Sequence, residues 1–159
     1  MKSDSNITIK EVVNSDELKK FVMFPHTLYK DSKYWVAPII KEELEVLNKE
    51  TNPVFNNAIA HYFLAYIDGE IVGRIAALIN WIEVKDLKKK KVRFGWFDFI
   101  DDQNVSKALL EKVIEIGKKN NLEFIEGPVG FSNMDKAGML IKGFEKKNTM
   151  ITMYNYSYY

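Results

Sequence analysis

This sequence predicts an α+β protein with one mixed, mainly antiparallel sheet flanked by helices. Two apolar segments, residues 60–67 and 70–79, enclose an Asp-Gly dipeptide and are typical of a hairpin. A third apolar segment, residues 92–100, extends them into an antiparallel meander. A helical pattern over residues 105–119 then leads directly into a short strand at 122–126. Because a strand, a helix and a second strand in this order form a right-handed parallel pair, the sheet is expected to be mixed.

The residues before the hairpin predict one strand and several short helices. Residues 7–13 are rich in β-branched side chains and are expected to form the first strand. The helical pattern that follows contains Pro25, which has no backbone N–H, so two short pieces are expected instead of one helix. Pro38 can begin a further helix, in which an apolar stripe is mixed with charge and which ends near residues 48–53.

The end of the chain predicts a last helix and a last strand. A short helix is expected between residues 134 and 142, with Gly143 ending it, and residues 150–159, rich in tyrosine, are expected to form a strand. We expect a single domain over residues 1–159 that could lack one or more final strands. An uncovered strand edge tends to find a partner. This predicts a homodimer through the last strand, or contact with the rest of a longer protein.

The composition argues against several functional classes. Twenty-three Lys and Arg residues against 22 Asp and Glu leave a net charge of +1, so no overall field attracts nucleic acid or anionic lipid. With no cysteine and two histidines, neither thiol chemistry nor a three-histidine metal centre is expected. No apolar run approaches the ~20 residues of a membrane helix. We therefore expect a cytoplasmic protein with no metal and with neither a membrane nor a nucleic acid as partner.

The order of the elements resembles that of a known superfamily. With residues 69–76 as the hairpin and Gly143-Phe144 after the last expected helix, the chain resembles the GNAT superfamily of acyl-CoA N-acyltransferases over nearly its whole length. Five segments are similar to a bacterial group of GNAT-like proteins that are usually longer than this chain: residues 28–30, 34–38, 52–55, 72–76 and 130–133. The resemblance implies transfer of an acyl group, from acetyl-CoA or another acyl-CoA, to an unknown small-molecule or peptide amine.

The resemblance also implies a cofactor site along the strand at residues 92–100. In GNAT enzymes the pantetheine arm of the cofactor pairs with this strand, which would place Phe97, Phe99 and Ile100 beside it in this chain. Asn133 lies where the family often carries an asparagine, and it is a further candidate for cofactor binding. A helix-capping or turn role is the default for that side chain.

The turn expected to hold the pyrophosphate of the cofactor departs from the family pattern. GNAT enzymes carry glycines or small residues there, and backbone amides at a helix N-terminus favour an anion. Residues 99–106 of this chain contain no glycine, and Asp101 and Asp102 add two carboxylates. These residues either cap the next helix, or bind an amine substrate or act as a base. The departure argues against tight binding of acyl-CoA.

Asp98 is a third acidic candidate. It lies inside the strand at residues 92–100 and faces the side opposite its two phenylalanine neighbours. The side chain could point into a cleft. Alternatively, it faces solvent or pairs with an arginine such as Arg74 or Arg93, since antiparallel sheets often wet one face.

Candidates for a general acid lie near the end of the chain. The family often has a tyrosine four residues before its terminal Gly-Phe, but Met139 stands there in this chain. Tyr154 or Tyr156 could replace it as a proton donor, although tyrosines at alternating strand positions usually pack. His26 and His61 are isolated from each other in the sequence, and a structural, hydrogen-bonded role is expected for both.

Three functions remain open at this point. The first is a GNAT-type N-acyltransferase, or the amino-terminal half of one, with Asp98, Asp101 and Tyr154 as catalytic candidates. The second is a catalytically degenerate GNAT-like module that recognises a substrate or a partner and does not bind CoA; the missing glycines and the missing tyrosine favour it. The third, a nucleic-acid binder, rests only on the lysine-rich residues 85–91, which are expected to form a solvated turn.

Overall fold

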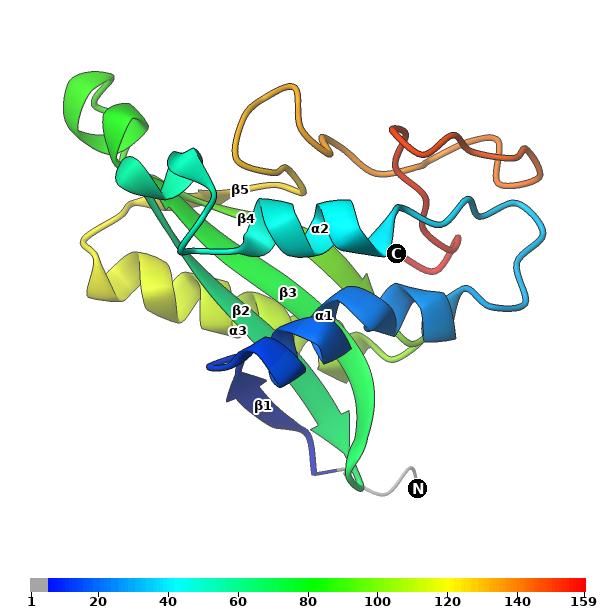
Figure 1. Ribbon diagram of the computed structural model, residues 1–159. Helices are drawn as coiled ribbons and strands as arrows, with labels where there is room; N and C mark the ends of the chain where they lie inside the picture. The colour runs from blue at the N-terminus through cyan, green and yellow to red at the C-terminus, as the bar shows by residue number, and fades with distance from the viewer. Residues whose placement is uncertain (1–5) are drawn as a thin grey trace.

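A computed structural model describes residues 6–159 as a five-stranded sheet between two layers of helices (Figure 1). The strands lie in the order β1-β2-β3-β4-β5, with β1 to β4 antiparallel and β5 parallel to β4. This confirms the expected α+β fold class and the mixed sheet. The elements are β1 (Thr8–Glu11), α1 (Ser15–Leu28), α2 (Ile40–Leu47), a 3-10 helix (Pro53–Asn56), β2 (Ala58–Ile67), β3 (Glu70–Asn80), a π-helical turn (Ile82–Asp86), β4 (Lys91–Phe99), α3 (Gln103–Lys119) and β5 (Phe124–Glu126).

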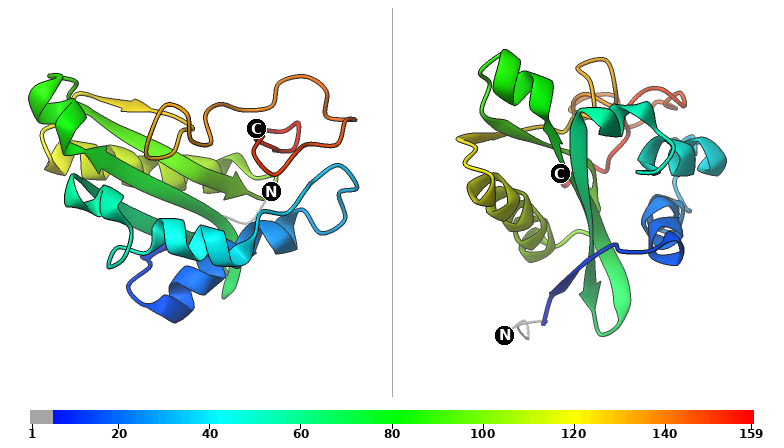
Figure 2. Two further views of the ribbon diagram at one scale, coloured as in Figure 1. Left: turned by 45° about the horizontal axis from the view of Figure 1, so that its top comes forward. Right: turned by 60° about the vertical axis from the view of Figure 1, so that its left-hand side comes forward.

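Helices cover both faces of the sheet and bury two separate cores. In the right-hand view of Figure 2, α3 lies on one side of the strands, whereas α1 and α2 lie on the other. Val105, Leu109 and Val113 pack α3 against one face of the sheet. Because Gly73 of β3 has no side chain where Val105 and Leu109 contact it, α3 can approach the sheet closely. Phe21, Val22 and Leu47 cover the opposite face. Among residues 6–159, no helix is long and apolar enough to cross a membrane.

The hairpin and the parallel pair form as expected. Asp68 and Gly69 both adopt left-handed backbone angles, with φ of 51° and 86°, which asparagine, aspartate and glycine tolerate best. β4 and β5 pair over three residues, from Lys91 opposite Phe124 to Arg93 opposite Glu126. Beyond that point the chain after β5 no longer follows β4 as a strand.

Gly95 of β4 allows the chain that follows β5 to cross β4 at close range. Val129 donates its N–H to the carbonyl of Phe94 at 2.8 Å, which carries the backbone directly over Gly95. A Cβ atom at Gly95 would lie 2.5 Å from the carbonyl oxygen of Val129. The crossing therefore requires a residue without a side chain at this position of β4.

The expected break at Pro25 is wrong, because α1 runs without interruption from Ser15 to Leu28. A proline inside a helix leaves the carbonyl four residues earlier without its N–H donor. That carbonyl belongs to Phe21, and Arg74 of β3 donates to it from Nη1 at 2.9 Å. A side chain from the sheet thus replaces the missing backbone bond.

The helix expected between residues 134 and 142 is not formed. This segment consists of turns and bends, and Lys136 and Gly138 both adopt left-handed backbone angles that an α-helix cannot accommodate.

The strand expected over residues 150–159 is also not formed. Side chains connect this segment to the rest of the protein. Asn155 accepts from the N–H of Leu140 at 2.8 Å and donates to its carbonyl, and Tyr158 donates to the carbonyl of Phe99. The strand edge on which the homodimer was argued is therefore missing from this segment, and the homodimer stays an untested prediction.

Replacing Leu109 by alanine should destabilise the fold strongly. Leu109 is fully buried between α3 and the sheet, so its truncation removes apolar contacts and leaves a cavity, at a cost of about 2–5 kcal/mol in the free energy of unfolding. Leu87→Ala is the matched control, because Leu87 is 58% exposed and should change stability by less than about 0.5 kcal/mol. Urea denaturation of both variants measures the difference. Equal losses in the two variants would contradict the packing of α3 described above.

Candidate functional site

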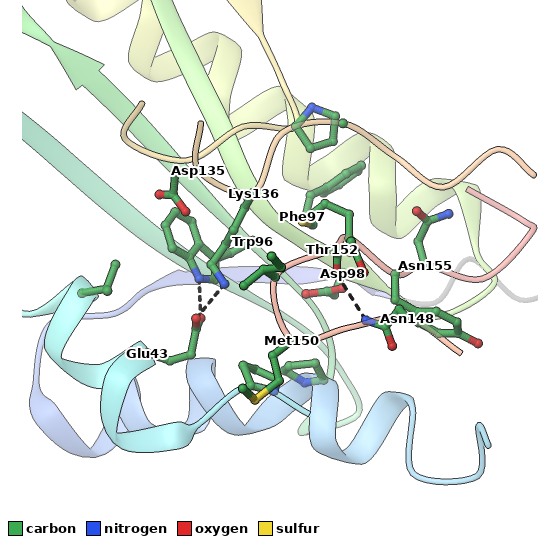
Figure 3. A pocket seen from close by; sticks show the side chains of 18 of the residues that line it. Glu43, Trp96, Phe97, Asp98, Asp135, Lys136, Asn148, Met150, Thr152 and Asn155 are labelled. Carbon is green, nitrogen blue, oxygen red and sulfur yellow. Dashed lines mark hydrogen bonds and ion pairs between the residues drawn. The ribbon is translucent and has the colours of Figure 1, made fainter. Parts of the chain in front are cut away.

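A cavity of about 560 Å³ opens beside the carboxyl end of β4 (Figure 3). Trp96, Phe97 and Asp98 contribute its lining from the strand. The ends of α1 and α2 and the segments around residues 128–139 and 148–155 contribute the other walls. The cavity thus lies where β4 extends beyond its pairing with β5.

A β-bulge shapes β4 at this cavity. Gly95 and Asp98, three residues apart, lie opposite Ala76 and Arg74, which are two residues apart, so β4 carries one extra residue. Trp96 falls within this stretch and has a φ of 46°, an uncommon value for a large side chain. A bulge turns the strand and takes one residue out of the regular ladder, which can present a backbone amide to the cavity.

A buried ion pair stands at the floor of the cavity. Arg74 contacts Oδ2 of Asp98 through Nε and Nη2, both at 2.7 Å, and the two residues are 6% and 8% exposed. They are direct neighbours across β3 and β4. Tyr29, at the end of α1, donates its hydroxyl to Oδ1 of Asp98 at 2.7 Å. The carboxylate is therefore held from two sides and is positioned to neutralise Arg74.

Two tyrosines extend this network to β4. Burial, with the nearby Asp98 carboxylate, raises the pKa of the Tyr29 and Tyr159 hydroxyls well above the usual tyrosine range, so both stay protonated. The two hydroxyls lie 2.9 Å apart, and Tyr159 accepts from the N–H of Phe99 at 3.1 Å. Tyr158 donates to the carbonyl of the same residue at 2.6 Å. Both backbone groups of Phe99 are thus bonded to tyrosine side chains.

A second polar cluster lies further along the cavity. Glu43, on the buried face of α2, accepts from Nε1 of Trp96 at 2.8 Å and from Nζ of Lys136 at 2.6 Å (Figure 3). Burial alone would raise the pKa of Glu43, but the Lys136 ammonium and the two hydrogen bonds outweigh it and lower the pKa. Glu43 is accordingly a carboxylate at neutral pH.

The structure brings only some of the predicted site residues to the cavity. Asp98, Phe97 and Tyr154 line it, and the hydroxyl of Tyr154 lies 2.6 Å from Oγ of Ser32. Of the alternatives given for Asp98, the structure shows the pair with Arg74.

The other predicted residues lie outside the cavity lining. Phe99 packs into the core that faces α3, and Ile100 donates its N–H to Val72. Asp101 is exposed, whereas Asp102 caps α3 by accepting from the N–H of Asn104 at 2.9 Å. Asn133 accepts from Nη2 of Arg93 at 2.6 Å. Their proposed roles toward a cofactor or an amine remain predictions.

The two histidines behave differently. His61 lies 2.6 Å from Glu11, as expected for a hydrogen-bonded structural residue. Nε2 of His26 is buried without a hydrogen-bond partner among the described residues, and the ring packs edge-on against Trp35. Burial and the charge of Arg74 lower the pKa of His26. The hydrogen-bonded role expected for His26 is therefore wrong for this nitrogen.

Three cavity residues were missed by the sequence reasoning: Glu43, Lys136 and Tyr29. Glu43 did carry a signal, because it lies on the same helical face as Ile40, Leu44 and Leu47, where a charged residue needs a buried partner. Lys136 lies in a segment assigned to a helix, and Tyr29 lies in one of the five segments similar to the longer GNAT-like proteins, but no role at a site was assigned to it.

Replacing Asp98 by asparagine should destabilise the protein by about 3–5 kcal/mol, because it leaves the buried guanidinium of Arg74 without a carboxylate. The matched control is Glu123→Gln, which breaks the pair of Lys90 and Glu123, side chains that are 55% and 66% exposed. That change should cost less than about 1 kcal/mol. Chemical denaturation measures both, and a small effect at Asp98 would contradict its structural role.

Comparisons with known proteins show which proteins this chain is similar to. No family model matches the chain. Protein YghO of Escherichia coli (strain K12) is 33% identical over 137 residues, which is 86% of this chain and 35% of that protein. Bacterial ceramide synthase of Caulobacter vibrioides (strain NA1000 / CB15N) is 27% identical over 144 residues, which is 90% of this chain and 38% of that protein. The chain thus spans little more than a third of the length of these curated relatives.

Solved structures share the fold at low sequence identity. A tandem GNAT protein from the clavulanic acid biosynthesis pathway superimposes with a TM-score of 0.57 and 12% identity, covering 74% of this chain and 34% of that one. A predicted acetyltransferase from Clostridium acetobutylicum, solved with acetyl-CoA, superimposes with a TM-score of 0.55 and 14% identity, covering 76% of this chain and 79% of that one. An aminoglycoside acetyltransferase from an uncultured soil metagenomic sample gives 0.54 and 16%, covering 77% of both chains. The sheet order, the parallel pair of β4 and β5 and these superpositions together show that this chain has the fold of the GNAT acyl-CoA N-acyltransferases.

Proposed function

We propose that this chain binds an acyl-CoA and transfers its acyl group to an amine. The observation that carries the proposal is the bulge of β4 at Trp96, which opens onto the 560 Å³ cavity where β4 extends beyond β5. A thioester placed along this part of β4 would have its carbonyl beside the backbone of residues 96–98. The cavity would then hold the amine.

The reaction follows from these positions. The amine attacks the thioester carbonyl after its ammonium form has given up a proton to water, so that the C–N bond forms, the carbonyl oxygen takes the negative charge and the nitrogen becomes positive. A backbone amide released from the ladder by the bulge can donate to this oxygen. The nitrogen then gives up a proton to water, the carbonyl re-forms as the C–S bond breaks, the amide product is released, and the thiolate leaves with its electron pair and takes a proton. Tyr154, which lines the cavity, is the proton donor we propose.

An acceptor with an alkyl chain suits the cavity. Four of the six methionines in the sequence line it, namely Met134, Met139, Met150 and Met153. Methionine is flexible and apolar, so such a wall adapts to a hydrocarbon chain. One relative is named bacterial ceramide synthase, and ceramides carry an acyl group on the nitrogen of a long-chain amino alcohol. We therefore propose an amine with an alkyl chain as the acceptor class.

One observation favours the competing function, a GNAT-like module without CoA. Tyr158 and Tyr159 bond to both backbone groups of Phe99, at the end of the strand along which the pantetheine would run. Asp101 and Asp102 place carboxylates beside the first turn of α3. An extended ligand would have to displace the tyrosine hydroxyls and tolerate these charges.

Isothermal titration with CoA separates the two functions. We expect weak binding, with a dissociation constant between about 10 μM and 1 mM, because the charges oppose the pyrophosphate. Asp101→Asn should strengthen binding about two- to fivefold, since it removes one exposed carboxylate near the α3 N-terminus and leaves the Asp102 cap intact.

The control is Asp16→Asn, which removes an exposed carboxylate from the first turn of α1 and should leave the affinity for CoA unchanged. An absence of heat from CoA in both the wild type and Asp101→Asn would reject the acyltransferase and favour the CoA-independent module. An equal gain from both substitutions would show that the pyrophosphate does not bind at α3.

A further inference from the structure

Glu43 is a carboxylate that α2 buries on the face it turns toward the sheet. It is 7% exposed and is one of two buried residues of α2, the other being Leu47. Its Oε2 accepts from Trp96, which leaves Oε1 to the ammonium of Lys136. Burying a carboxylate is unfavourable unless a cation or several donors compensate it. The site thus requires a cation at Oε1.

The surroundings of the Lys136 ammonium are those of a binding site for an amine. Nζ lies 2.6 Å from Glu43 and 5.7 Å from the centre of the Trp96 ring. The ring of Phe131 packs edge-on against Trp96 at 5.8 Å and closes the aromatic wall. An ammonium group that pairs with a carboxylate and also lies over an indole ring is favourably placed, by ion pairing and cation–π attraction.

Lys136 is the group that a ligand ammonium would have to displace from Glu43. It lies in a segment of turns and bends, outside the helices and strands, and its side chain is 25% exposed. Arg74 also faces the cavity, but its guanidinium is bound to Asp98 and Phe21 and is not free to replace Lys136. Asp135 and Glu42 also line the cavity, and Asp135 accepts from the N–H of Phe131. At Oε1 of Glu43, a ligand ammonium would compete with Lys136.

We propose that Glu43 and the indole of Trp96 form the binding site for the ammonium group of a primary alkylamine, and that Lys136 occupies this site until such a ligand displaces it. The alkyl chain of the ligand lies against the methionine side chains that line the same cavity. This inference rests on the proposed function in one respect, since it names where the acceptor amine of the transfer binds. Trp96 belongs to the bulge of β4, so the bound amine lies next to the strand proposed to hold the thioester.

Titration with n-hexylamine at neutral pH, followed by calorimetry, tests the site. Lys136→Met removes the competing ammonium and keeps a long apolar side chain. Because an intramolecular competitor acts at an effective concentration in the millimolar range, we expect hexylamine to bind about tenfold more tightly or better to this variant. Adding Glu43→Gln to Lys136→Met removes the charge that binds the amine, and binding should fall below that of the wild type.

Two controls separate this site from general effects. Lys142→Met makes the same change at an exposed lysine of the same segment and should leave the affinity for hexylamine unchanged. Hexanol has the same chain without the charge, and it should gain little from Lys136→Met. The N–H resonance of the Trp96 indole, identified by its loss in Trp96→Phe, should shift with hexylamine in the wild type and in Lys136→Met.

Several results would overturn the proposal. These are equal affinity of the wild type and Lys136→Met for hexylamine, equal gains for hexylamine and hexanol, and tight binding that persists without the Glu43 carboxylate. Circular dichroism checks folding, and Lys136→Gln replaces Lys136→Met if the latter does not fold. Because no step of this titration uses CoA, a protein that binds hexylamine but not CoA would keep this inference and reject the acyltransferase.

Discussion

The ion pair of Arg74 and Asp98 is the interaction on which the arrangement of this protein depends. The side chain of Arg74 joins three parts of the chain. It extends from β3, and its guanidinium binds the carboxylate on β4. The same guanidinium donates to the carbonyl of Phe21, which Pro25 leaves unpaired in α1. Arginine suits this role because its donors point in several fixed directions and its charge persists when buried. Tyr29 then binds the same carboxylate from the end of α1. The first helix is thereby fixed to the two central strands.

The cavity is a consequence of this anchoring and of two irregularities in the sheet. The bulge near Trp96 turns β4, and the pairing of β5 stops after three residues, so the end of β4 has no neighbouring strand on the side away from β3. Side chains cover it instead. Tyrosines bond to Phe99 at the far end, and Glu43 and Lys136 meet Trp96 at the other. The same strand therefore has the buried pair of Arg74 and Asp98 near one end of the cavity and the pair of Glu43 and Lys136 beside Trp96 near the other.

Much of the fold could be predicted from local patterns. The Asp-Gly turn and the apolar segments around it specify the hairpin, and the helix between β4 and β5 specifies a parallel pair. The continuity of α1 could not be predicted, because the donor that compensates Pro25 comes from Arg74, 53 residues after the Phe21 carbonyl that accepts it. The irregular course of residues 134–159 depends similarly on side-chain bonds to distant backbone groups, such as those between Asn155 and Leu140.

The candidate site was predicted less completely than the fold. Local alternation placed Asp98 on the side opposite its phenylalanine neighbours and left open a cleft, solvent, or a pair with Arg74 or Arg93. The structure shows the pair with Arg74, its neighbour across the strands. The contact of Glu43 with Lys136 joins residues 93 positions apart, and neither lies in a recognisable motif. A helical face with one acid among apolar residues is a signal that a buried partner is needed, but it does not tell which residue supplies it.

The central claim is that this cavity joins an acyl thioester to an alkylamine. Mass spectrometry of the products from acetyl-CoA and n-hexylamine tests it most directly. The account predicts N-acetylhexylamine and free CoA in equal amounts, and loss of the amide when the Glu43 carboxylate is replaced in Glu43→Gln. Binding of both ligands without any amide, or amide formation that does not depend on Glu43, would contradict it.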